Sequence, residues 1–473
     1  MTQSEALDIL KLGYNIFLTG PAGSGKTFLL NKYIEYLSQQ NIKVGVTAST
    51  GIASTHLNGR TIHSWSGFGI KDELSSQDMR KLLYSPQFRK RILSTKVLII
   101  DEVSMLHAHQ LDLVNKICMK VRNNPAPFGG LQVVLSGDFF QLRPVARGGQ
   151  ETYFVSSSDA WSEMGINVCY LGDCQYRQKD DNFIKLLNEI RKNKVSPANK
   201  KMLLGRKDSM TKNFIKPAKL LTHNNDVNAI NSFELAKIKG KQKSYSMTFI
   251  GQEKLVNSLK NGCLAPEKLV LKKKAIVMFV KNNFEKGYVN GTMGEVVGFN
   301  KDSYPIIETI SGNRITARPL SWELKEDEHE LARITQIPLR LAWAITIHKC
   351  QGMTLDMAEI DLSRAFDYGM GYVALSRVRS FSGIKLLGIN DLSFQVSEDA
   401  IELDKSLRKL SKKTEKNLEK MGIKKKREIQ EDFVLKSTDK NQPYDHENNE
   451  EEDDEDQDED HRVEYIDIEE IPF

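Results

Sequence analysis

Short apolar runs alternate with helical patterns in the first part of the chain. Four of these runs have the length of a strand and are mostly apolar: residues 15–19, 43–47, 97–100 and 132–135. Buried strands that alternate with helices are typical of a parallel sheet flanked by helices. We therefore expect a first α/β domain over residues 1–165, in which the polar, basic stretch at 64–93 is a small insertion.

A second alternating block follows and is interrupted in its middle. It contains two strand patterns and one helical pattern, at residues 167–171, 218–222 and 182–191. From 233 to 334 the pattern changes to short strands and turns, including an Asn-Gly pair, which indicates hairpins. We expect a second α/β domain formed by 166–232 and 335–395, with a small β-barrel inserted at 233–334.

The charges are distributed unevenly along the chain. Of its 67 basic and 62 acidic residues, one base and 16 acids lie in residues 445–473, which leaves a large positive surplus on the rest. A basic body favours a polyanionic partner, with nucleic acid first in line, although charge runs are often only solvated faces. Residues 396–444 are predicted to be a basic helical segment and 445–473 an acidic, disordered tail.

Composition disfavours several classes of protein. The 473 residues contain no apolar run of about 18 residues, so no transmembrane helix is expected. The first ten residues, MTQSEALDIL, lack the basic region of a leader peptide, and the five cysteines form no C-x-x-C pair. We therefore expect a cytoplasmic protein in a reducing compartment, without a disulfide scaffold or a zinc site.

The first motif with a chemical meaning follows the first predicted strand. Residues 20–27 fit the pattern G-x-x-x-x-G-K-[ST], between a strand and a helical pattern, as a phosphate-binding loop requires. Backbone N–H groups of such a loop wrap phosphates, the lysine reaches the β and γ oxygens, and the threonine hydroxyl faces Mg²⁺. The candidate nucleotide-binding residues are Gly20, Pro21, Ala22, Gly23, Ser24, Gly25, Lys26 and Thr27.

Two further strand ends carry polar side chains. Asp101 and Glu102 end the apolar run at 97–100, where Asp101 is predicted to hold Mg²⁺ and Glu102 to polarise the attacking water. Adjacent acids alone would more often be a solvated loop. Gln141 follows the run at 132–135, and an amide there is placed to sense the γ-phosphate.

The order of these motifs resembles superfamily 1 DNA helicases, most closely the PIF-type and RecD-like branch that moves 5′→3′. Gln3 is similar to the adenine-reading glutamine of that family. Further matches to its motifs are found at residues 47–53, 59–64, 176–178, 344–355 and 372–379. The resemblance covers about residues 3–380 and implies two RecA-like domains, ATP with Mg²⁺, and single-stranded DNA as the track.

The resemblance also implies roles for residues of the second block. Gln351 and Gly352 would contact the nucleotide, and Arg177 and Arg377 would reach across from the second domain to stabilise charge on the transferred phosphoryl group. A lone arginine is more often a solvated charge. The residues expected to contact the DNA strand are Thr47, Thr50, His63, Thr346 and His348, although both histidines could instead belong to the core.

Two positions depart from the family pattern. Arg143-Pro144 stands where Pro-Pro is common, and Cys350 stands where serine is usual. Neither removes a charged catalytic group. The insertion at 64–93 would be the duplex-splitting wedge in the family, which its composition does not demand.

The end of the chain resembles the C-terminal tip of bacterial single-stranded-DNA-binding proteins. Residues 467–473 place three acids before Ile-Pro-Phe. The resemblance implies docking onto replication and repair proteins, through an apolar pocket with a basic rim. A competing hypothesis has the tail cover the chain's own basic groove as a DNA mimic, and accidental composition is a third explanation.

The function expected from these observations is an ATP-dependent 5′→3′ DNA helicase that acts on single-stranded DNA and on forked or tailed duplexes. The alternative is a P-loop ATPase that switches or loads partners on DNA without unwinding it. The pair Arg177 and Arg377 favours the motor, because a simple switch does not need them.

Overall fold

The structure is a computed structural model that describes residues 1–438 apart from 58, 70, 72, 145–152, 173–179, 208–216, 284 and 327–328. The predicted tail lies outside the described residues. Met1–Thr438 form one compact unit. Among the helices described, none combines the length and the apolar character that crossing a membrane requires.

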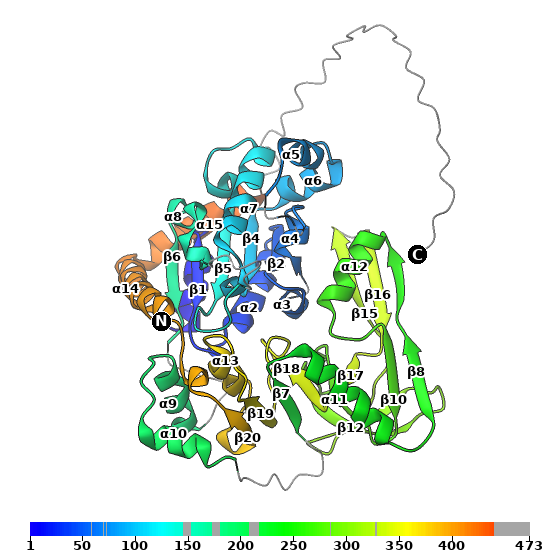
Figure 1. Ribbon diagram of the computed structural model, residues 1–473. Helices are drawn as coiled ribbons and strands as arrows, with labels where there is room; N and C mark the ends of the chain where they lie inside the picture. Colours follow the sequence, from blue (N-terminus) through cyan, green and yellow to red (C-terminus); the bar gives the residue numbers. More distant parts are fainter. Residues whose placement is uncertain are drawn as a thin grey trace, which may run out of the picture. The chain divides into compact units, whose positions relative to one another are not determined.

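The first domain is built on a six-stranded parallel sheet in the order β3-β2-β4-β5-β1-β6 (Figure 1). Its strands are β1 (Ile16–Thr19), β2 (Val44–Ala48), β3 (Arg60–Thr61), β4 (Val97–Asp101), β5 (Gln132–Gly137) and β6 (Asn167–Tyr170). β1, β4 and β5 are buried along their whole length, as their apolar runs predict. The helices of this part of the chain are α1 (Gln3–Leu10), α2 (Lys26–Gln39), α3 (Gly51–His56), α7 (Ala108–Arg122) and α8 (Asp159–Glu163).

One expected domain boundary is wrong. Residues 167–170 were expected to open the second domain, yet β6 pairs in parallel with β1, with Asn167 opposite Ile16 and Tyr170 opposite Thr19. An apolar run identifies a buried strand but carries no information on its partner. β6 therefore completes the first sheet, and the second domain begins after it.

The insertion expected at 64–93 is helical. It comprises α4 (Ile62–Trp65), α5 (Ser76–Leu83) and α6 (Pro86–Ser94). Ser75 and Asp78 form a reciprocal capping box at the start of α5, and Pro86 occupies the first turn of α6. Met79, Phe88 and Ile92 are buried against the first domain's core.

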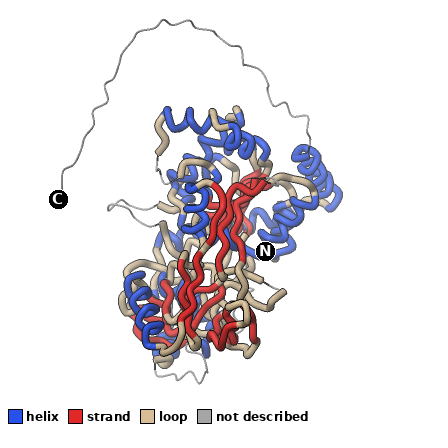
Figure 2. The backbone as a smooth tube through the Cα atoms, turned by 90° about the vertical axis from the view of Figure 1, so that its right-hand side faces the viewer, coloured by secondary structure: helices blue, strands red, loops and turns tan. Residues whose placement is uncertain are grey.

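The second domain has a four-stranded parallel sheet in the order β18-β7-β19-β20. The strands are β7 (Ala218–Leu221), β18 (Ala344–Thr346), β19 (Ala358–Leu362) and β20 (Ile384–Ile389). Its helices are α9 (Asp181–Ile190), α10 (Pro197–Leu204), α11 (Asn224–Lys237) and α13 (Met370–Ser376). Figure 2 shows helices beside the strands, as expected for two RecA-like units.

The inserted β-region consists of antiparallel strands in three sheets. A five-stranded sheet contains β11 (Ile276–Phe279), β12 (Met293–Phe299), β13 (Pro305–Thr309), β14 (Arg314–Thr316) and β17 (Leu339–Leu341). A three-stranded sheet contains β9 (Thr248–Gly251), β15 (Leu320–Glu326) and β16 (His329–Gln336). A two-stranded sheet pairs β8 (Gln242–Ser246) with β10 (Lys268–Lys272). Helix α12 (Glu253–Gly262) packs on β16.

The expected limits of this insertion, 233 and 334, are both wrong by several residues. α11 continues without a break to Lys237, and β17 pairs with β11 through Leu341 and Val277. Helix ends and strand partners depend on tertiary packing, so they shift relative to the local pattern.

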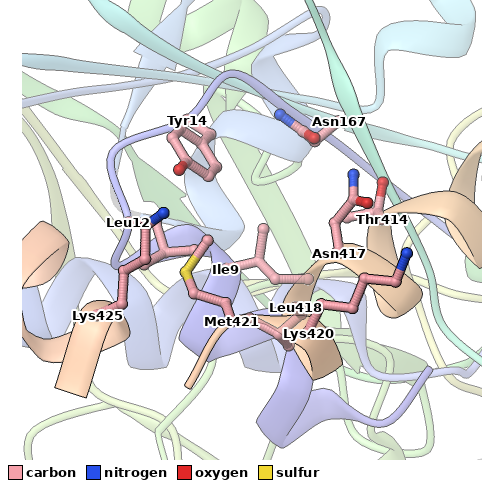
Figure 3. A pocket seen from close by; sticks show the side chains of 10 residues that line it. All are labelled: Ile9, Leu12, Tyr14, Asn167, Thr414, Asn417, Leu418, Lys420, Met421 and Lys425. Carbon is pink, nitrogen blue, oxygen red and sulfur yellow. The ribbon is translucent and has the colours of Figure 1, made fainter. Parts of the chain in front are cut away.

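The basic segment forms α14 (Glu398–Lys420) and α15 (Ile423–Thr438), and α14 packs on the edge strand β6. The N–H of Tyr170 donates to Oγ of Ser411 (3.1 Å), and the Met1 ammonium pairs with Glu415 (2.6 Å). Figure 3 shows a cavity of about 400 Å³ lined by side chains of α1, α14 and α15 and of nearby loop and strand residues, with apolar walls and two lysines, Lys420 and Lys425. The segment is thus part of the folded body.

Candidate active site

The phosphate loop connects β1 to α2. Gly23 and Gly25 have φ of +83° and +87°, a backbone region that glycine adopts at little cost. Lys26, the first residue of α2, is 9% exposed, and its Nζ donates to the carbonyl oxygens of Gly20 (2.8 Å) and Pro21 (3.2 Å). Burial lowers the pKa of Lys26, while the nearby carboxylate of Asp138 opposes this. The loop therefore presents backbone N–H groups at the start of a 14-residue helix.

Two acids stand at the carboxyl end of β4. Asp101 is buried, and its Oδ1 accepts the N–H of Glu102 (2.9 Å). Glu102 has φ +53° and ψ +43°, which is rare for a side chain of this size and marks a functional turn. Burial raises the pKa of Asp101, and burial together with the Asp101 charge raises the pKa of Glu102 to about 7.

These groups surround a cavity of about 450 Å³, a size that suits a nucleotide. Both domains contribute to it. Its lining residues are Ala22, Gly23, Gly25, Lys26, Thr27, Phe28, Glu102, Gln141, Gly352, Thr354, Arg377 and Arg379. The cavity thus contains Lys26 and Glu102 from the first domain and Arg377 from the second.

Arg377 is 2% exposed and lies directly after α13. Its Nε donates to the carbonyl of Val373 (3.1 Å) and its Nη2 to Oγ of Ser376 (2.8 Å). The positive charge of the Arg377 guanidinium partly offsets the rise in the pKa of Glu102, so the two groups lie within electrostatic reach of each other. Arg177, the second predicted arginine, lies outside the described residues.

Other predicted nucleotide contacts lie around the cavity. Gln3 donates through Nε2 to the carbonyl of Ser24 (3.1 Å), so it braces the phosphate loop from α1. Gln351 lines a neighbouring cavity, and its Nε2 donates to Oε2 of Glu102 (3.3 Å) across the domain boundary. Gln141 is 4% exposed, and its Oε1 has no hydrogen-bond partner among the described residues.

These residues fit ATP and Mg²⁺. The loop N–H groups, Lys26 and Arg377 suit a polyphosphate, and Gln141, whose Oε1 has no hydrogen-bond partner within the described part of the chain, adds a polar side chain to the lining. Thr27 lines the cavity, and Asp101 ends β4 directly before Glu102, which also lines it; Thr27 and Asp101 offer the hydroxyl and carboxylate ligands that Mg²⁺ takes beside phosphate oxygens.

The residues expected to contact DNA are only partly brought together. Thr50 and His348, from the two domains, line one cavity of about 150 Å³ next to Glu102. Burial lowers the pKa of His348, so its imidazole is mainly neutral at pH 7. His63 lies on α4, with its ring 5.0 Å from that of Phe68, and does not line this cavity.

The expectation for Thr47 is wrong. Its side chain is 0% exposed, and its hydroxyl donates to the carbonyl of Ile99 (2.7 Å). The hydroxyl therefore ties β2 to β4 inside the sheet, where no strand of DNA can reach it. Thr346 is 1% exposed and its hydroxyl has no partner among the described residues, so its contact with DNA stays a prediction.

Sequence reasoning assigned no role to four residues at this site. Arg379 lines the nucleotide cavity and pairs with Asp356 (3.3 Å), although it stands inside a motif that was recognised. Asp138, Arg191 and Tyr372 form a buried network beside the phosphate loop. The available signal was the position of these residues inside segments that resemble family motifs, which does not identify their partners.

Family comparisons agree with this geometry. Residues 3–201 match the family PIF1-like helicase, and residues 254–299 match the family DNA helicase Pif1, 2B domain. The chain is 43% identical to the ATP-dependent DNA helicase Pif1 of Psychrobacter sp., over 92% of this chain and 75% of that protein. It is 34% identical to human ATP-dependent DNA helicase PIF1, over 86% of this chain and 63% of that protein.

Solved structures show the same architecture. Pif1 of Bacteroides sp. in complex with ADP-AlF4 superposes with a TM-score of 0.75 at 30% identity, covering 86% of this chain and 96% of that one. Bacteroides Pif1 bound to ssDNA gives a TM-score of 0.59 at 29% identity, covering 85% and 96%. Because sequence, fold and the composition of the nucleotide cavity agree, this chain belongs to the PIF1-like family of ATP-dependent DNA helicases.

Proposed function

We propose that this protein is an ATP-driven motor that moves 5′→3′ on single-stranded DNA and unwinds forked or tailed duplexes. The observation that carries the proposal is the nucleotide cavity shared by both domains, with Lys26 and Glu102 on one side and Arg377 on the other. A cavity divided in this way couples the state of the nucleotide to the separation of the domains. That coupling is what a translocating motor requires.

Each group has a role in hydrolysis of ATP. Lys26 binds the β- and γ-phosphates, and Thr27 and Asp101 would hold Mg²⁺, which supplies positive charge next to the phosphates. Glu102 orients the attacking water and accepts its proton. Arg377, with Arg177 as the second predicted arginine, neutralises charge that develops on the transferred phosphoryl group.

The contact between Gln351 and Glu102 links hydrolysis to the DNA side of the cleft. Gln351 donates to the catalytic carboxylate and lines the same cavity as Thr50 and His348. A shift of Glu102 during the reaction is therefore transmitted to residues proposed to contact the strand. His63 and Thr346 complete the proposed set of DNA contacts.

Known relatives support a DNA substrate. Solved structures include Bacteroides Pif1 with ssDNA and two Pif1 helicases at forked dsDNA. We infer the same substrates for this chain. The basic body adds phosphate contacts that do not depend on base sequence.

The test is unwinding of duplexes that bear only a 5′ or only a 3′ single-stranded tail. We expect ATP-dependent unwinding of the 5′-tailed substrate and none by Lys26→Ala. Unwinding of the 3′-tailed substrate alone would contradict the proposed polarity. An ATPase rate that single-stranded DNA does not raise would favour the alternative, a switch or loader that binds DNA without unwinding it.

We also infer that the acidic residues around Ile471-Pro472-Phe473 recruit replication or repair proteins. Support comes from their composition, since acids beside an apolar tripeptide suit an apolar pocket with a basic rim. Replacing Ile471 and Phe473 with alanine should abolish binding to proteins that also bind the tip of single-stranded-DNA-binding proteins. If this variant still binds those proteins, the inferred recruitment through the C-terminal tripeptide is wrong.

A further inference from the structure

The hydroxyl of Tyr372 lies at a buried junction between the two domains. Tyr372 belongs to α13, is 0% exposed, and accepts a hydrogen bond from the N–H of Ala22 in the phosphate loop (2.9 Å). It accepts a second hydrogen bond from Nη1 of Arg191 (2.9 Å) and donates to Oδ2 of Asp138 (3.1 Å). A hydroxyl has one donor and two acceptor positions, so all of them are used.

Arg191 and Asp138 hold this hydroxyl in a rigid frame. Nη1 of Arg191 lies 2.8 Å and 3.0 Å from the two carboxylate oxygens of Asp138, and both side chains are almost wholly buried. The guanidinium also lies over the ring of Phe140, at 4.1 Å from its centre. Burial opposes the charge of Arg191, but Asp138 together with Tyr372, Tyr170 and Asp404 outweighs it, so the pKa of Arg191 is raised well above its ordinary value.

Asp138 extends the frame to the predicted phosphate sensor. Its carbonyl accepts the N–H of Gln141 (2.9 Å), which closes a tight turn after β5. The phosphate loop, the turn that carries Gln141, and α13 therefore meet at one buried point. Two residues assigned to the nucleotide site take part in these contacts: Ala22 of the phosphate loop, and Gln141, whose Nε2 also donates to Oδ2 of Asp138 (3.5 Å).

Arg377 follows the end of the same helix directly, five residues after Tyr372. The helix begins at Gly369, whose φ is +79°, and a Cβ there would lie only 2.6 Å from the carbonyl oxygen of Phe140. The first turn of α13 is thus packed backbone against backbone on the turn that precedes Gln141. Because a short helix moves as one unit, contacts at Gly369 and Tyr372 determine where Arg377 emerges.

We propose that Tyr372 is a positioning residue for ATP hydrolysis: its hydroxyl holds α13 against the phosphate loop, so that Arg377 faces the nucleotide. The inference rests on the proposed role of Arg377. Tyr372 is not among the residues that line the nucleotide cavity, so it acts through Arg377 and through the loop at Ala22.

The test is Tyr372→Phe, which removes one oxygen, measured as kcat and KM for ATP with saturating single-stranded DNA. We expect kcat to fall on the order of tenfold, about the value of one lost buried hydrogen bond, with a smaller change in KM. The matched control is Tyr33→Phe. Tyr33 is also 0% exposed, and its hydroxyl donates to Oε1 of Gln132 (2.7 Å) in the first domain's core.

A double-variant cycle separates positioning from stability. Arg377→Ala should lower kcat by about 10³-fold or more, and adding Tyr372→Phe to it should cost no further activity, because residues that act as a unit are not additive. Tyr33→Phe should lower the midpoint of thermal unfolding but leave kcat within about twofold of the wild type. Arg191→Lys, which keeps the charge but loses the planar fork, provides a milder second variant with the same expected pattern.

Two results would overturn the proposal: a kcat for Tyr372→Phe no lower than that of Tyr33→Phe, or losses that multiply in the double variant. Failure of the proposed function has a different signature. In that case the wild type lacks DNA-stimulated ATPase activity, or Arg377→Ala leaves it unchanged. If Tyr372→Phe does not fold, Arg191→Lys decides by the same cycle.

Discussion

Glu102 combines an uncommon backbone conformation with a buried carboxyl group whose neighbours are Asp101, Lys26 and Arg377. A carboxyl group with a pKa near neutrality is a better proton acceptor than an ordinary surface glutamate. The backbone geometry aims the side chain into the cavity and not along the strand. At the residue scale, the proposed chemistry therefore depends on the position of one carboxylate, that of Glu102, as the proposed base.

Glu102→Gln should lower kcat for ATP hydrolysis by roughly 10²–10⁴-fold, because the amide keeps the shape of the side chain but cannot accept a proton. Affinity for a non-hydrolysable ATP analogue should change little, since Lys26 and the loop remain. Steady-state kinetics and an analogue titration measure both quantities. Glu431→Gln, an exposed position on α15, is the control, and equal rates for the two variants would refute the assignment.

Elements of this fold are joined by few but specific contacts. Helix α14 follows the second domain in sequence yet packs on β6 of the first, where Ser411 caps the N–H of Tyr170. The Tyr170 hydroxyl donates to Oδ1 of Asp404 (2.7 Å) and accepts a hydrogen bond from Nη2 of Arg408 (2.7 Å). Helix α14 thus covers β6, the edge strand of the first sheet. An uncovered edge strand could pair with another chain, so covering it protects the fold.

Ser411→Ala should destabilise the chain by roughly 1–3 kcal/mol, because a buried N–H loses its acceptor. Ser406→Ala, on the exposed side of the same helix, removes only a local bond to the carbonyl of Leu403 and should cost less than about 0.5 kcal/mol. Denaturant unfolding monitored on both variants measures the difference. Equal stabilities would show that α14 is not held by this contact.

At the largest scale, residues 1–438 join two parallel sheets, an antiparallel insertion and a basic helical segment in one compact unit. Residues of both α/β domains line the candidate nucleotide cavity, and Thr50 and His348 line an adjacent cavity. Net charge is a property of this scale, because the basic surplus belongs to the chain before the acidic stretch at 445–473.

Affinity for single-stranded DNA should fall steeply with salt. With about three or more phosphates neutralised, we expect a loss of roughly tenfold or more between 50 and 200 mM salt, at a slope of about −0.7 per phosphate. Fluorescence anisotropy at several salt concentrations gives this slope, and different base sequences should give the same value. A slope near zero would contradict binding through the basic body.

The sequence alone predicted the candidate nucleotide site, because a phosphate loop, an acid pair after a strand and a final arginine motif each lie in a few consecutive residues. The spacing within such segments determines backbone conformation and ligand type directly. Lys26, Glu102 and Arg377 line one cavity, as that reasoning expected. Tertiary structure decided which strand joins which sheet, as for β6, and which hydroxyl is inaccessible, as for Thr47. It also decided that Tyr372 meets Ala22 across 350 positions of sequence, because partners so distant are selected by packing of the whole chain, which no local pattern encodes.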